Sequence, residues 1–161
     1  MTVKDYNKAV EDYSNGIYRF ILKNIKDVDK AQDVVQDTFE KCWIKHETVE
    51  AAKVKSYLFS TAYHTMIDLI RKESRQVNFN ELRQESIIYD NQYSDLNEIL
   101  HKAIQLLPDA QRSVILLRDY EGYSYEEIAE ITGLSESQVK VYIYRGRVFL
   151  KNYIGSPEKV L

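Results

Sequence analysis

Two helix-start signals, placed on either side of a glycine, restrict the fold of this chain more than any other feature. Ser124 is followed three positions later by Glu127, and Ser135 is followed three positions later by Gln138. In such a capping box, the serine hydroxyl and the later side chain satisfy the free N–H groups at the start of a helix. Gly133 lies between the boxes and suits a sharp turn, because glycine tolerates backbone conformations that are closed to other residues. The pattern therefore predicts a helix-turn-helix.

The second of these helices is expected to run from Ser135 through Leu150 and to have distinct inner and outer faces. Val139, Ile143 and Gly146 recur at helical spacing and are expected to face the core. The N-terminal part of the outer face is the part that a helix-turn-helix presents to the DNA major groove. The side chains expected to meet DNA are Ser135, Ser137, Gln138, Lys140, Val141, Tyr142, Tyr144, Arg145 and Arg147.

The residue types on this outer face match the chemistry of DNA. Gln138 can pair with adenine, Arg145 can pair with guanine, and Val141 can contact a thymine methyl group. Lys140 and Arg147 are better placed for phosphates, which position a protein on the duplex without specifying a sequence. The face therefore combines candidate base readers with candidate backbone contacts.

Charge is unevenly distributed along the chain, although the net charge is −3. Residues 53–75 contain five basic and two acidic residues, and residues 138–151 contain four basic residues and no acidic one. An ordinary hairpin with a solvated basic face is the alternative interpretation, but a solvated helix normally mixes charges of both signs. Phosphate neutralisation needs lysine and arginine. We therefore expect DNA binding that is weak in the isolated chain and depends on a partner.

Apolar residues recur at helical spacing through most of the remaining chain. They mark three helices before residue 75 and two more between residues 96 and 120. Asp29 is a candidate N-cap for the second helix, and Gly122 is a candidate C-terminal cap before the helix-turn-helix. The expected fold is all-α, with two small helical domains joined by a flexible linker. The expected segments are a first domain at 1–75, a linker at 76–94, a helix-turn-helix domain at 95–155 and a tail at 156–161.

Composition disfavours several classes of protein. A single cysteine, Cys42, excludes an internal disulfide framework. The three histidines lack the spacing of metal ligands, so we expect no metal and no cofactor. No nucleophile is paired with a base and no phosphate-binding loop is present, which argues against an enzyme. Because there is neither a signal sequence nor an apolar run long enough to cross a bilayer, we expect a cytoplasmic protein without membrane insertion.

The C-terminal half of the sequence resembles region 4 of the ECF-type (extracytoplasmic function) sigma factors of bacterial RNA polymerase. The similar stretches are Leu107–Arg118, Glu121–Ser135 and Gln138–Arg147. Tyr142 occupies a position where many members carry arginine, and Gly146 one where many carry alanine. The resemblance implies that the helix-turn-helix reads the minus-thirty-five element of a promoter as duplex DNA.

The first domain resembles region 2 of the same family. Asp33–Phe39 and Trp43 are similar to the helix that docks on the polymerase clamp, and Ser56–Tyr63 with Arg71 is similar to the helix that meets the minus-ten element. In such proteins the preceding loop, here about residues 47–55, opens the minus-ten region, and nearby aromatic side chains hold an unpaired base. The residues implied in polymerase binding are Asp33, Gln36, Phe39 and Trp43. The residues implied at the minus-ten element are Lys53, Lys55, Tyr57, Tyr63, His64, Asp68, Arg71 and Lys72.

The resemblance also implies partners, and it leaves some alternatives open. The implied partners are core RNA polymerase, through its clamp coiled coil and its flap, promoter DNA and an anti-sigma factor. Phe39 and Trp43 lie on an apolar stripe and could instead be core residues, and Asp68 with Arg71 could form a simple ion pair on the helix surface. His64 stands where many relatives carry asparagine. The competing function is a dimeric regulator that binds operators without polymerase, but the first domain shows no identifiable dimer interface.

Overall fold

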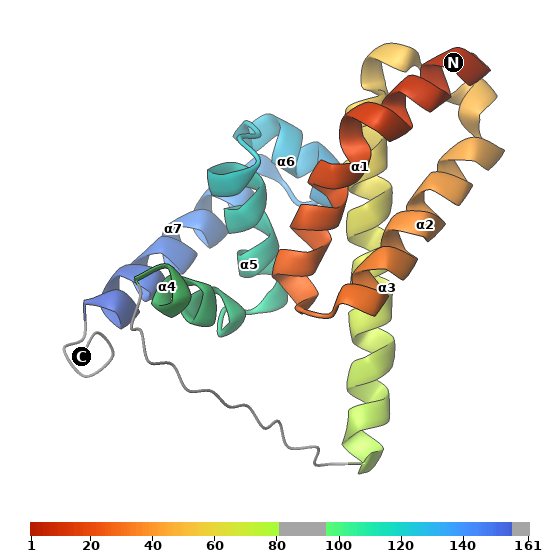
Figure 1. The fold of residues 1–161 in the computed structure, drawn as a ribbon. Coiled ribbons are helices and arrows are strands. Elements are labelled where there is room, and N and C mark those ends of the chain that lie inside the picture. Colours follow the sequence, from red (N-terminus) through yellow and green to blue (C-terminus); the bar gives the residue numbers. More distant parts are fainter. Residues whose placement is uncertain (81–95, 156–161) are drawn as a thin grey trace.

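The computed structural model describes residues 1–80 and 96–155, and in these residues helices are the only regular secondary structure (Figure 1). The all-α prediction is therefore confirmed. We refer to residues 1–80 as the N-terminal half and to residues 96–155 as the C-terminal half. The N-terminal half contains α1 (Val3–Ile25), α2 (Val28–Ile44), the short 3-10 turns η1 (His46–Thr48) and η2 (Ala51–Lys53), and α3 (Val54–Asn80). The C-terminal half contains α4 (Leu96–Gln105), α5 (Asp109–Ile115), the π-helical turn η3 (Leu116–Tyr120), α6 (Tyr125–Thr132) and α7 (Glu136–Ile154).

The three long helices of the N-terminal half pack through their apolar stripes. Each buried side chain of the size of Leu, Ile or Phe contributes about 1.5–3 kcal/mol to folding. Polar residues occupy the remaining faces, so the stripes fix how the helices pair. The buried apolar side chains of these stripes include Ile17, Phe20 and Ile21 of α1, Val34, Phe39 and Cys42 of α2, and Leu58, Phe59 and Met66 of α3.

Helix α2 begins before the position that the sequence pattern indicates. Asp27 is its N-cap, and the Oδ1 atom of Asp27 accepts a hydrogen bond from the N–H of Lys30 at 3.0 Å. The prediction of Asp29 as the cap is wrong, because both aspartates offer the same capping chemistry and the preceding turn decides between them. In that turn Lys26 adopts a left-handed backbone conformation with φ 55. Asp29 lies instead in the first turn, where its charge interacts favourably with the helix dipole.

The helix-turn-helix prediction is confirmed by α6, α7 and the turn between them, although α7 continues to Ile154, beyond the expected end at Leu150. The Oγ of Ser124 accepts from the N–H of Glu127, and the Glu127 carboxylate accepts from the N–H of Ser124 at 2.8 Å. Ser135 and Gln138 form the same reciprocal pair at the start of α7. Gly133 ends α6 with φ 80, a conformation that other residues rarely adopt. Both capping boxes therefore fix where the two helices begin.

Gly146 on α7 has a packing reason. It is buried against α5, where a Cβ atom at position 146 would lie 2.9 Å from Cδ1 of Ile115 and 3.0 Å from its Cγ1. Two helices can approach this closely only where one of them lacks a side chain. The glycine therefore sets the distance between α5 and α7.

The two halves pack directly against each other rather than lying apart. Their most extensive contact joins α3 to α6, and α1 also contacts α5 and η3 (Figure 1). The buried apolar side chains of both halves form one continuous core. This packing places the helix-turn-helix beside the long helix α3, and it determines which surfaces of both remain exposed.

The described helices also bear on the segment boundaries expected from the sequence. Helix α3 continues to Asn80, so residues 76–80 are helical although the expected linker includes them. The rest of that linker lies outside the described residues, as does the expected tail at 156–161.

Candidate nucleic-acid interface

The outer face of α7 is open to solvent over most of its length. Ser137, Val141, Tyr144 and Arg145 are all exposed, and Tyr144, at 70%, is the most exposed of the large apolar side chains of α7. Tyr142 is half-buried and packs against the core. Four of the expected base-reading positions therefore form a free surface at the N-terminal end and middle of the helix.

Two of the expected DNA contacts have a structural task as well. Ser135 and Gln138 hold the capping box, in which Oε1 of Gln138 accepts a hydrogen bond from the N–H of Ser135 at 2.9 Å. A bidentate contact with adenine needs both the amide oxygen and the amide nitrogen of a glutamine. Gln138 can thus donate from Nε2 to DNA while capped, but accepting from a base competes with the cap.

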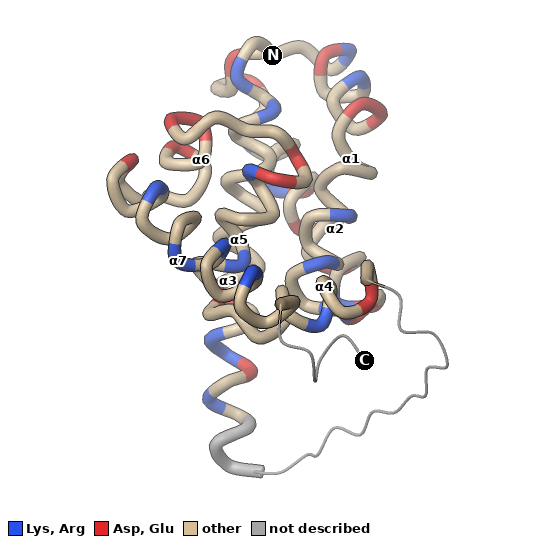
Figure 2. Tube along the Cα trace, turned by 90° about the vertical axis from the view of Figure 1, so that its left-hand side faces the viewer, with Lys and Arg blue, Asp and Glu red and all other residues tan. Residues whose placement is uncertain are grey.

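The cations of the helix-turn-helix are held in place by acids and by one aromatic ring. Arg147 donates through Nε and Nη2 to Asp119, and Lys140 lies 3.6 Å from Glu136. These pairs are largely exposed, and exposed pairs contribute about 0–1 kcal/mol, so exchanging an acid for a phosphate costs little. Figure 2 shows basic positions recurring along α7 and along the part of α3 beyond the bundle.

Tyr125, at the first position of α6, is a residue that the sequence reasoning missed. The guanidinium of Arg118 lies 4.5 Å from the centre of the Tyr125 ring, and the ammonium of Lys140 lies 5.7 Å from it. A hydrogen bond with Asp119 raises the pKa of Arg147, and one with Tyr125 adds to it. The Tyr125 ring therefore lies close to cations from two elements, Arg118 of η3 and Lys140 of α7. Arg118 lies in the π-helical turn η3, and no pattern in the sequence predicts such a turn.

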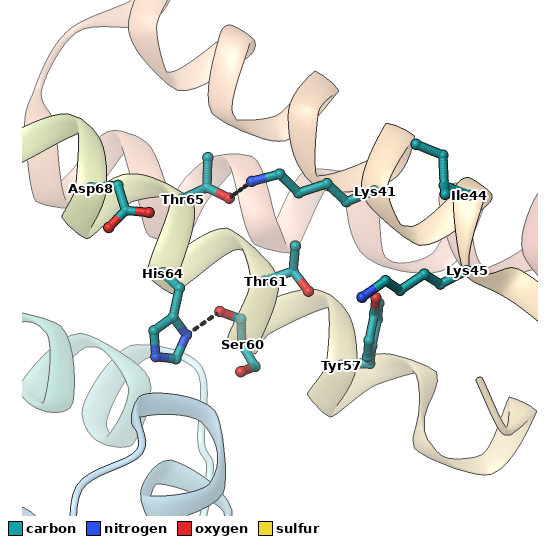
Figure 3. Close-up of a pocket in the computed structure, with 9 residues that line it drawn as sticks. All are labelled: Lys41, Ile44, Lys45, Tyr57, Ser60, Thr61, His64, Thr65 and Asp68. Atoms are coloured by element: carbon teal, nitrogen blue, oxygen red, sulfur yellow. Dashed lines mark hydrogen bonds between the residues drawn. The ribbon is translucent and has the colours of Figure 1, made fainter. Parts of the chain in front are cut away.

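A cavity of about 480 Å³ lies between α2 and α3 (Figure 3). Lys41 of α2 and Lys45, the residue that caps α2, line it on one side, and Tyr57 and His64 border it from α3. Nζ of Lys41 donates to Oγ1 of Thr65 at 2.9 Å, which fixes one lysine at the rim. The lining residues are Lys41, Ile44, Lys45, Tyr57, Ser60, Thr61, His64, Thr65 and Asp68.

This cavity combines an aromatic ring, hydroxyl groups and two ammonium groups. Such a set suits an unpaired nucleotide, whose base stacks on aromatic rings while its phosphate meets cations. Nδ1 of His64 lies 2.9 Å from the backbone carbonyl of Ser60, so the ring is held with Nε2 directed away from α3. Of the expected minus-ten residues, the structure brings Tyr57, His64 and Asp68 together here.

The other expected minus-ten residues are divided between solvent and the C-terminal half. Lys53, Arg71 and Lys72 are exposed. Tyr63 is only 7% exposed, so its ring offers little surface to a base in this arrangement. Burial raises the pKa of the Tyr63 hydroxyl. The ammonium of Lys55 lies 4.8 Å from the ring centre of Tyr123, a residue of the C-terminal half.

The expected polymerase face on α2 is partly surface and partly core. Asp33 and Gln36 are exposed, but Phe39 is 8% exposed and packs in the core, so it is not a surface residue. Trp43 is 43% exposed, with its ring stacked on His46 at 4.3 Å between centres. The Asp68–Arg71 ion pair considered from the sequence is not among the salt bridges of the described residues.

Ile44, next to Trp43, is the residue that the sequence reasoning missed on this face. Its side chain is 78% exposed, the highest value among the large apolar residues in the described part of the chain. It falls off the apolar stripe of α2, and an apolar residue off the stripe was the available signal. Trp43 and Ile44 thus form an exposed apolar patch at the C-terminal end of α2.

Two family models match the chain, one in each half. The model described as "Sigma-70 region 2" matches residues 9–76, and the model described as "Sigma-70, region 4" matches residues 97–150. The first match contains the cavity between α2 and α3, and the second contains the helix-turn-helix.

Individual proteins give the same result. The chain is 31% identical to the ECF RNA polymerase sigma factor SigM of Bacillus subtilis, over 86% of this chain and 88% of that protein. It is 32% identical to the RNA polymerase sigma factor SigV of the same organism, over 85% and 83%. A solved structure of the sigma factor RpoE in complex with the anti-sigma factor NepR from Bartonella quintana is similar with a TM-score of 0.81 and 30% identity, covering 96% of this chain and 99% of that one. In the described residues, no helix is both long and apolar enough to span a membrane.

Proposed function

Because the chain belongs to the ECF family of RNA polymerase sigma factors, we propose that its helix-turn-helix reads the minus-thirty-five promoter element as duplex DNA, and that the cavity between α2 and α3 receives an unpaired base of the minus-ten element. Members of this family bind RNA polymerase, direct promoter-specific initiation and catalyse no reaction of their own. The observation that carries the proposal is the pairing of an open helix-turn-helix face with an aromatic, lysine-lined cavity in one chain.

Support for reading the minus-thirty-five element comes from the exposed set on α7. Arg145 can donate two hydrogen bonds to guanine, and Val141 can contact a thymine methyl group. Arg118, Lys140 and Arg147 surround or adjoin the Tyr125 ring and can bind phosphates on either side of the bases. Replacing Arg145 by alanine should cost about 1–3 kcal/mol of promoter binding and relax specificity at one base pair.

Support for the minus-ten assignment comes from the contents of the cavity. Tyr57 offers a ring for stacking, and Lys41 and Lys45 offer cations for the backbone of the displaced strand. Because base stacking on an aromatic side chain contributes about 1–3 kcal/mol, Tyr57→Leu should reduce strand opening about 5- to 150-fold. Tyr18→Leu is the matched control, since Tyr18 is also a half-buried tyrosine but lies on α1, away from the cavity.

Support for polymerase docking comes from the exposed apolar patch that Trp43 and Ile44 form at the C-terminal end of α2. Trp43 and Ile44 present apolar surface, while Asp33 and Gln36 add polar groups on the same helix. Interfaces commonly centre on such aromatic anchors. Phe39 is a poor probe of this face, because Phe39→Ala empties part of the core and costs about 3–5 kcal/mol of folding stability.

An anti-sigma factor is proposed as a further partner. The similar RpoE from Bartonella quintana is solved in complex with the anti-sigma factor NepR, and the likeness covers nearly the whole of both chains. Exposed apolar residues on α7, among them Val148 and Phe149, provide a surface that a protein partner could cover.

The test is reconstituted transcription with core polymerase and sequencing of the start sites. The chain should yield promoter-specific transcripts absent with core polymerase alone, and alignment upstream of the start sites should show two elements. Trp43→Ala and Ile44→Ser should weaken pull-down of core polymerase, whereas Leu106→Ser, an exposed apolar control at 59%, should not. Tight duplex binding by the isolated chain, with no transcripts in the full reaction, would instead identify an autonomous regulator.

A further inference from the structure

Trp43 is an exposed residue whose ring is nevertheless held by two other aromatic side chains. Its ring lies almost parallel to the imidazole of His46, with centres 4.3 Å apart and an angle of 9° between the planes. Tyr6 meets the same ring edge-on, with centres 5.0 Å apart and an angle of 62°. Helices α1 and α2 run antiparallel, so the start of α1 lies beside the end of α2 and brings Tyr6 to this place (Figure 1).

His46 is fixed by the turn that follows α2. Its Nδ1 lies 2.7 Å from the backbone carbonyl of Trp43. Because a carbonyl oxygen can only accept a hydrogen bond, Nδ1 carries the hydrogen in this contact. The N–H and the hydroxyl of Thr48 both donate to the carbonyl of Lys45, at 2.9 and 2.8 Å, and these bonds hold η1. The backbone at the end of α2 therefore sets the place of the imidazole, whose face is left for Trp43.

Tyr6 is fixed by the same helix that carries Trp43. Its hydroxyl donates to the backbone carbonyl of Phe39 at 3.0 Å, and its ring meets the buried ring of Phe39 edge-on, with centres 6.4 Å apart. Burial raises the pKa of the Tyr6 hydroxyl, so the hydroxyl stays protonated and remains a donor. Phe39 lies one helical turn before Trp43 on α2. Tyr6 is therefore anchored to the core at one turn of α2 and contacts Trp43 at the next.

This anchoring bears on how Trp43 binds a partner. An aromatic side chain that is free on a surface samples several rotamers, and a partner must select one of them. The loss of that freedom on binding weakens affinity about 2- to 12-fold for each side chain. A ring already held in one orientation avoids the loss, which is why rigid aromatic side chains serve as interface anchors.

We propose that Tyr6 and His46 are positioning residues, which hold the Trp43 ring in the orientation that core polymerase binds. This inference rests on the proposed function, in which Trp43 and Ile44 form the docking patch. Neither Tyr6 nor His46 is among the residues that the family resemblance implies in polymerase binding, and Tyr6 precedes residues 9–76, which the region 2 model matches. Both residues act through Trp43 and need no contact of their own with the polymerase.

Polymerase affinity in a double-mutant cycle tests this role. Tyr6→Leu and His46→Leu each remove a ring contact and should weaken the binding of core polymerase about 2- to 12-fold. Because both act through the same ring, neither change should weaken binding further in a Trp43→Ala chain. Tyr18→Leu is the matched control and should leave the affinity unchanged. Tyr18 is another half-buried tyrosine of α1, and in the described residues it is not one of the rings that meet Trp43.

The fluorescence of Trp43 supplies a readout that a merely structural role would not move. Trp43 is the single tryptophan of the chain, so time-resolved anisotropy of the free protein reports the motion of this ring alone. Tyr6→Leu and His46→Leu should increase the amplitude of the fast, local decay, whereas Tyr18→Leu should not. Tyr6→Phe and His46→Phe keep a ring against Trp43, so they should retain the wild-type decay and an affinity within about twofold of the wild type.

The possible outcomes separate this inference from the proposed function. If Tyr6→Leu loses its helical circular dichroism, His46→Leu decides, because His46 lies in the short turn η1 and not in the three long helices. The positioning role is overturned, and the proposed function stands, if folded leucine variants keep the wild-type polymerase affinity or the wild-type anisotropy decay. Losses that persist at full size in the Trp43→Ala chain would overturn it in the same way. A wild-type chain that fails to bind core polymerase would refute the proposed function and the positioning role together.

Discussion

Replacing Gly146 by alanine sets two effects of similar size against each other. Alanine stabilises the middle of a helix by about 1 kcal/mol relative to glycine. Its Cβ, however, would lie 2.9 Å from Cδ1 and 3.0 Å from Cγ1 of Ile115, a residue that is 1% exposed and packed in the core. Overpacking of this kind costs about 1–3 kcal/mol. We therefore expect Gly146→Ala to lower the free energy of unfolding by about 0–2 kcal/mol.

Two comparisons isolate the steric effect. Gly16→Ala should stabilise by about 0.5–1 kcal/mol, because the Cβ at this helical position would meet its neighbours at 3.5 Å or more. Ile115→Val removes Cδ1 and should cost about 0.5–1.5 kcal/mol in the wild type but less in Gly146→Ala. Urea unfolding followed by helical circular dichroism measures the stabilities of the wild type, the three single variants and the Gly146→Ala/Ile115→Val double variant. A Gly146→Ala variant that is about 1 kcal/mol more stable, with effects that add to within about 0.5 kcal/mol, would refute the steric reasoning.

Three further predictions concern caps, buried polar groups and pH. Ser135→Ala should cost about 1 kcal/mol of stability in urea unfolding, because it removes the cap of α7, whereas the exposed Ser137→Ala should cost little. Ser113→Ala leaves the buried Oδ1 of Asn24 without its donor and should cost about 1–3 kcal/mol, measured in the same way. Hydrogen bonds from Ser124 hold the pKa of Glu127 below its ordinary value of 4.5, so its contribution to stability is present above pH 4.5 and is lost as pH falls further. Unfolding of Glu127→Gln followed across this range should show a shallower loss than the wild type, and an unchanged slope would contradict this assignment.

The helix-turn-helix could be predicted because its determinants are local. Both capping boxes, with Gly133 between them, lie within a short stretch, and each signal acts on neighbouring backbone. The buried face of α7 was equally accessible, since Val139 and Ile143 recur at helical spacing and are buried. The same pattern placed Gly146 on the core face, whereas its close contact with Ile115 of α5 is seen only in the structure.

What the sequence did not show depends on contacts between distant residues. Arg19 donates two hydrogen bonds to the buried carboxylate of Glu121, 102 positions away, and nothing near either residue signals the pair. The extent to which Tyr63 is buried and the contact of Lys55 with Tyr123 depend on how the halves pack, which no local pattern in the sequence shows. The π-helical turn that orients Arg118 had no periodic signature either.

The candidate site follows the same division. The choice of α7 came from residue types and spacing and that of α3 from the family resemblance, whereas the cavity needs Lys41 of α2 and Lys45, which caps α2, to face Tyr57 of α3. Phe39 shows what helical periodicity alone does not distinguish. An aromatic residue on the apolar stripe of a helix can pack in the core or bind a partner, and the 8% exposure of Phe39 assigns it to the core.

The ion pair between Arg19 of α1 and Glu121, which follows η3, also limits which domains of related proteins can be combined in one chain. The acceptor lies in one half and the donor in the other, so a chimera that joins residues 1–80 to the C-terminal half of a relative keeps the pair only if that half supplies an acid at the equivalent position. The two halves match separate family models, yet one core and one buried carboxylate tie them together. Recombination between paralogues is therefore constrained by the seam between the halves as well as by the DNA-binding and polymerase-binding surfaces.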